Sequence, residues 1–260
     1  MGRPAAARLV SSDDALAIAE EAARAAGALL VERFGSEHPL RTKSTPTDLV
    51  SEADLASERL IRELLQERAP DDGIVGEEGD DVPSRSGRRW VVDPLDGTVN
   101  YLFGHPQWCV SVACEDVAGV IFDPLRDELF AGGVGLATTL NGVEVDPSTC
   151  TALSQALVAT GFGYDATQRG VQGQLAARLL PLCRDIRRAG SAALDLAWTA
   201  AGRCDAFFEH GVQRWDVAAG KLLCAGAGLD VRDMRARDGL PAGTFAAPPA
   251  IADELFALVD

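Results

Sequence analysis

Apolar residues recur at helical spacing in two stretches near the start of the chain. The first stretch is predicted to be a helix that begins at Ser11–Asp14 and ends at about Phe34. Its apolar positions, three or four residues apart, are Leu16, Ala19, Ala23, Ala26 and Leu30. The apolar positions of the second predicted helix are Leu55, Leu60, Ile61, Leu64 and Leu65. The polar, turn-rich segment Arg41–Asp48 lies between the two helices and is predicted to be a loop.

Short apolar runs that end in acids follow the second helix. Residues 73–78 and the run that begins at Trp90 and ends at Asp93 are both predicted to be strands with carboxylates at their tips. From Trp108 to Gly133 the pattern alternates strand and turn, which predicts an antiparallel sheet. The dipeptide Asn141-Gly142 is a hairpin signal.

The second half of the chain alternates between strands and helices. Strands are expected at 156–160, 186–188 and 205–209, and helices at 168–183, 191–201 and 215–225. Alternation of this kind favours a more parallel α/β arrangement. We therefore expect an N-terminal α+β lobe over residues 1–150, with most of the acids described below, and a C-terminal α/β lobe over residues 151–260.

Composition narrows the class of protein. The chain has 260 residues, of which 47% are hydrophobic and 24% charged, as in an ordinary globular protein. A net charge of −15 argues against binding to nucleic acid or to an anionic membrane. No apolar run approaches the length of a membrane span, and the first residues lack the apolar core of a signal peptide, so a cytoplasmic location is expected.

Six cysteines occur without any Cys-x-x-Cys pair. Most lie in apolar surroundings, so buried free thiols are predicted, with a structural zinc site as the alternative.

The segment Asp93–Thr98 presents the first candidate chemistry. Pro94 interrupts strand pairing, so the chain must turn within the next residues, and the carboxylates of Asp93 and Asp96 then face one spot. Hard oxygen ligands grouped in this way suit Mg²⁺ or Mn²⁺. A helix that opened at Gly97 would offer free backbone N–H groups to an anion, which together with a metal suggests phosphate chemistry. The alternative is a plain surface turn, because Asp, Pro and Gly are ordinary turn residues.

Three other segments add acids or a helix start, and each also has an ordinary structural explanation. Asp54 lies near the start of the second helix, where a negative charge is favourable in any case. Asp216 lies at the start of a predicted helix, where a capping carboxylate is common. Gly190–Ala193 could simply be a loop that enters a helix.

Taken together, these segments resemble the inositol monophosphatase family of Mg²⁺-dependent, Li⁺-sensitive phosphatases. The matching segments, in chain order, are Lys43 with Asp48–Asp54, Gly76–Glu78, Asp93–Thr98, Gly190–Ala193 and Trp215-Asp216. The resemblance implies an α+β fold, a layered α-β-α-β-α sandwich of the inositol monophosphatase and fructose-1,6-bisphosphatase type, with the site between the lobes.

The resemblance also implies a ligand set for two to three Mg²⁺ ions, with Mn²⁺ as a possible substitute. One ion would be held by Glu77, Asp93 and the backbone carbonyl of Leu95. Asp93, Asp96 and Asp216 would hold a second, and a third, weaker ion would lie near Glu77.

By the same resemblance, Asp54 and Thr98 would orient the attacking water and accept its proton. Glu77 is expected to be catalytic with them, and one of the ions would lower the pKa of its bound water. The N–H groups of Gly97 and Thr98 would hold phosphate oxygens, and the loop of Lys43 would close over the site.

Inositol 1-phosphate is the substrate that the resemblance favours. Glu209 and Ala192 match positions that contact the ring in inositol-specific members, and Asp96 and Asp216 would face the substrate as well. Relatives with the same metal set handle histidinol phosphate, fructose 1,6-bisphosphate and nucleotide phosphates. A homodimer is the family's usual state.

Two alternatives differ in kind. A haloacid dehalogenase-type phosphatase needs Asp-x-Asp-x-Thr, whereas Asp93 and Asp96 are three residues apart. A non-catalytic role as a partner of the transcription machinery is known among relatives, but it would not need the five acids present here. The chain departs from the family pattern at 115–118 and 135–139, outside the ligand set.

Overall fold

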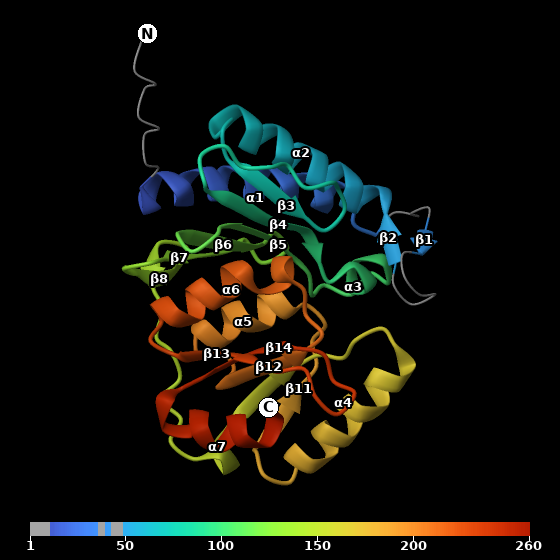
Figure 1. Cartoon of the computed structure of the whole chain (residues 1–260), viewed down its shortest axis with the longest axis vertical. Coiled ribbons are helices and arrows are strands. Elements are labelled where there is room, and N and C mark those ends of the chain that lie inside the picture. The colour runs from blue at the N-terminus through green and yellow to red at the C-terminus, as the bar shows by residue number, and fades with distance from the viewer. Residues whose placement is uncertain (1–10, 36–39, 43–48) are drawn as a thin grey trace.

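Helices and strands alternate in five layers along the long axis of the molecule (Figure 1). The computed structural model describes residues 11–35, 40–42 and 49–260. Helices α1 and α2 form one outer layer, a seven-stranded sheet the next, α5 and α6 the middle, a five-stranded sheet the fourth, and α4 and α7 the last. The expected α-β-α-β-α sandwich is confirmed.

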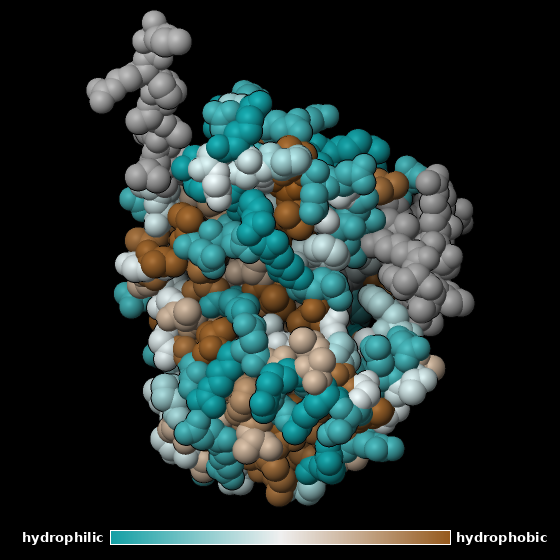
Figure 2. All heavy atoms as spheres, in the orientation of Figure 1, coloured by the Kyte–Doolittle hydropathy of each residue, from teal (hydrophilic) through white to brown (hydrophobic). Residues whose placement is uncertain are grey.

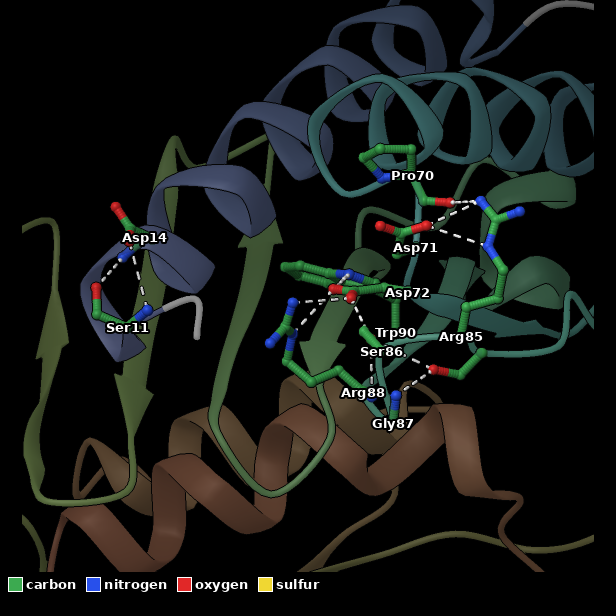
Figure 3. A network of polar contacts seen from close by, with 11 residues as sticks. Ser11, Asp14, Pro70, Asp71, Asp72, Arg85, Ser86, Gly87, Arg88 and Trp90 are labelled. Atoms are coloured by element: carbon green, nitrogen blue, oxygen red, sulfur yellow. Dashed lines mark hydrogen bonds and ion pairs between the residues drawn. The ribbon is translucent and has the colours of Figure 1, made fainter. Parts of the chain in front are cut away.

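Both helices predicted near the start of the chain are present. Helix α1 spans Ser12–Arg33, and Ser11 caps it through a reciprocal bond with Asp14, which Figure 3 shows. Its buried face consists mainly of alanines, so the helix can lie close to the sheet. Helix α2 spans Glu52–Arg68.

Strands β1 (Leu40–Thr42) and β2 (Leu49–Ser51) form a small antiparallel pair between these two helices. The expected loop therefore begins later than predicted, because residues 41 and 42 belong to β1. The rest of that loop, residues 43–48 with Lys43, lies outside the described residues.

The seven-stranded sheet has the order β3-β4-β5-β6-β7-β8-β9. Its strands are β3 (Gly73–Gly76), β4 (Arg89–Asp96), β5 (Cys109–Cys114), β6 (Ala118–Asp123), β7 (Glu128–Gly133), β8 (Leu136–Leu140) and β9 (Val143–Glu144). Strand β3 runs parallel to β4, and all later pairs are antiparallel. The antiparallel arrangement predicted between Trp108 and Gly133 is confirmed by the pairs of β5 with β6 and of β6 with β7. The hairpin at Asn141-Gly142 is also confirmed, with both residues at positive φ, 50° and 78°.

A buried carboxylate fixes the start of β4. Asp72 accepts hydrogen bonds from the Trp90 indole at 3.1 Å, the Ser86 hydroxyl at 2.5 Å and the Arg88 guanidinium at 3.3 Å (Figure 3). Because Asp72 directly precedes β3, this network ties the two parallel strands together at one end. Their register pairs Gly76 with Val92, so the residues that follow, one of them Asp93, come out side by side at the other end.

The five-stranded sheet has the order β11-β10-β12-β14-β13. Its strands are β10 (Leu157–Thr160), β11 (Asp185–Arg187), β12 (Ala206–His210), β13 (Asp230–Met234) and β14 (Gly243–Ala247). Parallel pairing of β10 with β11 and β12 agrees with the predicted alternation. Strand β14 is antiparallel to both of its neighbours, which the sequence pattern did not predict.

The remaining helices cover this second sheet or the site. They are α3 (Thr98–Leu102), the 3₁₀ turn η1 (Leu153–Gln155), α4 (Ala166–Leu179), α5 (Ala192–Ala200), α6 (Arg214–Gly226) and α7 (Pro249–Val259). Helices α5 and α6 pack between the two sheets, and their buried residues form one hydrophobic cluster with residues of both sheets. The middle layer therefore belongs to the core of both halves.

All six cysteines are free, and five of them are buried, as expected. On the face in Figure 2, hydrophobic side chains appear in separate patches among hydrophilic ones. None of the helices in the described part of the chain is long and apolar enough to cross a membrane.

Candidate active site

A cavity of about 470 Å³ opens where the ends of several strands meet. Its wall comes from the end of β4 with the start of α3, the loop after β10, the segment from Arg188 to Ala192, and the end of β12 with the start of α6. Every candidate acid named above, except Asp54, lines this cavity.

A bulge near the end of β4 delivers two of these acids. The predicted strand ends at Asp93, but β4 continues to Asp96, and its register against β5 shifts between these two residues. Asp93 Oδ1 accepts a bond from the backbone N–H of Leu95 at 3.0 Å, which closes a tight turn around Pro94. The extra residues leave both carboxylates at the same end of the sheet.

Gly97 then directs the chain into α3. Its φ of 99° lies in the left-handed region, and a Cβ there would lie 2.9 Å from the carbonyl oxygen of Gln107. Glycine is therefore required on both counts. Gly97 occupies the N-cap position of α3, as predicted.

Thr98 lines the cavity and contacts Asp54, which does not line it. Thr98 Oγ1 lies 3.0 Å from Asp54 Oδ1 and 3.1 Å from the carbonyl oxygen of Leu95. Asp54 is fully buried and Thr98 nearly so. The hydroxyl thus connects a buried carboxylate to the turn that carries Asp93 and Asp96.

Asp216 reaches the same place from the second half of the chain. Its Oδ2 accepts the backbone N–H of Gln213 at 2.6 Å, so the carboxylate does help to cap α6, as the structural explanation held. It also joins the acids of β4, since one oxygen each from Asp93, Asp96 and Asp216 lie within 4.8 Å of one another. Asp216 therefore serves the helix start and the cluster at once.

Glu77 follows β3 directly and lines the cavity. It lies outside the group of three whose oxygens are mutually within 4.8 Å, but its charge acts on that group.

Burial and mutual repulsion make this cluster unfavourable without a cation. Burial raises the pKa of Asp93 well above its usual range, and the charges of Glu77, Asp96 and Asp216 raise it further. The pKa of Asp216 is likewise raised well above its usual range, first by burial and then by Asp96. Oxygen donors held together against their own repulsion are the donor set that a divalent cation binds, so these residues fit a metal of the Mg²⁺ type.

Asp96 is held by the second half of the chain. Its Oδ2 accepts the Ser191 hydroxyl at 2.6 Å and the backbone N–H of Ala193 at 2.7 Å. Burial raises the pKa of Asp96, while these hydrogen bonds at the start of α5 lower it. Ala192, a predicted substrate contact, opens this helix and lines the cavity.

Glu209 closes the cavity on the side away from β4. Glu209 belongs to β12 and lines the cavity. Burial, followed by the charge of Asp195, raises the pKa of Glu209 to about 8. Gly161 lets this carboxylate approach, because a Cβ at that position would collide with it. Arg188 on the same wall offers a positive charge, which partly offsets these acids.

The sequence pattern did not point to several of these residues. Gly161, Phe162, Arg188 and Gln213 line the cavity without having been singled out. A turn signal, Gly-Phe-Gly, directly after a predicted strand would have indicated the loop at 161–163, whereas nothing local marks Arg188.

The model of the family described as "Inositol monophosphatase family" matches residues 11–259. The chain belongs to the inositol monophosphatase family. It is accordingly a phosphoric monoester hydrolase of a metal-dependent family that acts on small phosphorylated substrates. The haloacid dehalogenase alternative is set aside by this match over nearly the whole chain.

Relatives within the inositol monophosphatase family carry two kinds of name. "Inositol-1-monophosphatase SuhB" of Mycobacterium tuberculosis is 46% identical over 235 residues, which cover 84% of this chain and 80% of that protein. "Nus factor SuhB" of Xylella fastidiosa is 41% identical over 230 residues, which cover 86% of this chain and 83% of that protein.

Solved structures of the family have the same fold. The extragenic suppressor protein suhB from Bartonella henselae matches with a TM-score of 0.86 and 34% identity, covering 93% of this chain and 96% of that one. Inositol monophosphatase from Anabaena matches with a TM-score of 0.81 and 35% identity, covering 94% of each chain.

Proposed function

We propose that this phosphatase hydrolyses inositol 1-phosphate to inositol and phosphate with Mg²⁺ as its cofactor. The observation that carries the proposal is the carboxylate cluster of Asp93, Asp96 and Asp216 beside a cavity that Glu209 closes. The cluster suits a metal that binds phosphate, and the polar wall opposite suits a hydroxylated ring.

Two to three ions fit the acids of the cavity, in the arrangement that the family resemblance implies. Glu77, Asp93 and the Leu95 carbonyl would hold one ion, and Asp93, Asp96 and Asp216 a second. A third would lie near Glu77, and Mn²⁺ would substitute for Mg²⁺. Such ions neutralise phosphate charge, and they lower the pKa of a water bound to them so that hydroxide is available near neutral pH.

The chain's own residues would then position the reactants. Thr98, held between Asp54 and the Leu95 carbonyl, would orient the attacking water, and Asp54 would receive the proton through it. The N–H groups of Gly97 and Thr98 would donate to phosphate oxygens. Lys43 is proposed to belong to the loop that closes the site.

On the opposite wall, Glu209 and the backbone at Ala192 would contact hydroxyl groups of the ring. Asp96 and Asp216 would face the same substrate from the metal side. A polar site of this kind rejects substrates that leave its buried groups unpaired.

The test compares phosphate release from inositol 1-phosphate, histidinol phosphate and fructose 1,6-bisphosphate, each with Mg²⁺ and with or without Li⁺. We expect preference for the inositol ester and inhibition by Li⁺. Preference for another ester would reassign the substrate on the same scaffold. Release from none of the three would contradict the proposal.

A second candidate role is binding to the transcription machinery, since relatives that are 41% and 39% identical bear the name Nus factor. An Asp93→Asn variant separates the two roles, because it removes a proposed metal ligand and leaves the surface unchanged. A cellular function that survives in a variant without phosphatase activity would favour the binding role.

We further propose that the protein is a cytoplasmic homodimer without nucleic-acid or membrane partners. The acidic charge supports the absence of nucleic-acid binding. Light scattering during size-exclusion chromatography would give a mass of twice 27.4 kDa if the dimer forms.

A further inference from the structure

An ion pair on α2, formed by buried Glu58 and partly buried Arg62, contacts the backbone that follows β3. Glu58 is 2% exposed, and its carboxylate accepts the backbone N–H groups of Glu78 at 2.7 Å and Gly79 at 2.8 Å. Arg62 Nε donates to the same carboxylate at 2.6 Å, and Arg62 Nη1 donates to the carbonyl of Asp80 at 2.9 Å. The pair thus holds three consecutive residues of this loop.

Glycines allow the loop to come so close. A Cβ on Gly76 would lie 2.5 Å from Glu58 Oε1, and one on Gly79 would lie 2.9 Å from the same oxygen. Any side chain at either position would push the carboxylate away. The two glycines of the sequence Gly-Glu-Glu-Gly therefore leave the space that the carboxylate of Glu58 occupies.

The buried face of α2 that carries Glu58 also holds two other parts of the site. Asp54, one turn earlier, contacts the Thr98 hydroxyl at 3.0 Å. Ser57 donates to the carbonyl of Pro94 at 2.8 Å. Residues at this spacing share one side of a helix, so a single turn of α2 contacts three separate segments around the cavity.

We propose that Glu58 is a positioning residue of the metal site, which places the Glu77 carboxylate beside Asp93. The peptide unit between Glu77 and Glu78 is planar and carries one of the two bound N–H groups. Holding that unit fixes the direction in which the Glu77 side chain leaves the backbone. The inference rests on the proposed function, because it assigns Glu77 to a metal.

The role predicts an effect that a merely structural ion pair would not have. A structural pair contributes to the stability of the fold in any state. A positioning residue changes the affinity for metal, whereas turnover at saturating metal depends on it little. Metal affinity and stability must therefore be measured separately.

The experiment is calorimetric titration of Mn²⁺ into the metal-free, full-length protein. Glu58→Gln keeps the size of the side chain but turns an NH₂ group toward backbone donors, so at least one of the two bonds is lost. We expect the dissociation constant for Mn²⁺ to rise about 10-fold or more. The Mg²⁺ concentration for half-maximal activity should rise in parallel, while the KM for substrate at saturating Mg²⁺ stays within about threefold.

Glu63→Gln is the matched control, because it makes the same change at an exposed position of the same helix. It should bind Mn²⁺ like the wild type. Thermal unfolding of each variant in a chelator measures any general loss of stability.

Gly79→Ala provides a second variant that leaves Glu58 in place but pushes its carboxylate aside. It should weaken Mn²⁺ binding in the same way. Affinities of both variants within about twofold of the wild type would overturn the positioning role while leaving the proposed function intact. A wild-type protein that binds no Mn²⁺ would overturn the metal assignment and this inference together.

Discussion

Asp93 is the residue on which the charges of the site converge. It is 1% exposed, lies in the bulge of β4, and has Glu77, Asp96 and Asp216 around it. Folding must therefore bring like charges together where little of each carboxylate is exposed to water. A bound cation would compensate this repulsion.

Replacing Asp93 or Asp216 by Asn is expected to abolish turnover and leave the fold intact. Loss of a metal ligand should reduce kcat/KM by about 100-fold to 10,000-fold. In a chelator, the same variants should melt at a higher temperature than the wild type, because each removes one repelling carboxylate. Phosphate release and circular dichroism measure the two effects, and near-normal activity in either variant would contradict the metal assignment.

Glu209 gives a prediction for pH. Since burial raises its pKa to about 8 from an ordinary value of 4.5, the folded state holds a proton that the unfolded state releases between these values. The contribution of Glu209 to the stability of the metal-free protein should therefore fall as pH rises from about 4.5 to 8, by at most about 1.4 kcal/mol per pH unit.

Glu209→Gln removes the titrating carboxyl group and therefore its contribution to the pH dependence of stability. The melting temperature of the variant, relative to the wild type, should therefore increase across the same pH range. Glu144→Gln on β9, at an exposed position, is the control and should show no such trend. With substrate, Glu209→Gln should mainly change the preference among phosphate esters; an unchanged preference would remove Glu209 from the proposed substrate contacts.

At the scale of elements, the turn from β4 into α3 determines the shape of the site. Gly97→Ala should destabilise the protein by about 2 kcal/mol, or roughly 4 to 8 °C in Tm, and should also reduce activity. The cost combines a left-handed φ with a contact to the Gln107 carbonyl.

Gly135→Ala separates these two contributions. Gly135 also has a positive φ, 75°, but a Cβ there meets no atom within 4 Å. This control should lose stability through φ alone and keep full activity. Equal activity losses in both variants would show that the turn at Gly97 has no special role.

Periodicity predicted most elements but not the way they end. Helix α4 was expected from residue 168, yet it begins at Ala166 because Asp165 caps it by accepting the N–H of Gln168. Strand β4 was expected to stop at Asp93, because Pro94 cannot donate to a strand ladder. The bulge carries the strand past that proline, and bulges have no signal in hydrophobic alternation.

The candidate acids could be named from the sequence, since carboxylates after strands and at helix starts are visible there. The residues that hold these acids in place could not be identified in the same way. Ser57, Glu58 and Arg62 look like ordinary positions of an amphipathic helix, and only tertiary contacts reveal what they hold. Arg188 and Gly161 likewise depend on neighbours far away in the chain.

At the scale of the whole molecule, we propose that the chain divides near residue 150 into the two expected lobes. The first sheet ends with β9 at Glu144, and η1 of the second half begins at Leu153. Helices α5 and α6 nevertheless bury residues against both sheets, so the lobes share their middle layer.

Metal binding should stabilise the entire chain. At a metal concentration 100 times the dissociation constant, the gain is about 2.7 kcal/mol, or roughly 5 to 11 °C in Tm. Mn²⁺ and Mg²⁺ should each produce this rise in a thermal melt, and Asp93→Asn should lose most of it. A rise of the same size in Asp93→Asn would place the binding elsewhere on the acidic surface.

The bond between Ser191 and Asp96 joins residues that lie 95 positions apart in the chain. A ribosome adds Asp93 and Asp96 early and Asp216 last of the three, and the 120 residues after Asp96, up to and including Asp216, take roughly 6 to 24 s to synthesise. Throughout that interval the first acids lack their final neighbour. A polypeptide that ends before Asp216 therefore contains most of the acids but lacks the complete cluster, and we expect it to have no phosphatase activity.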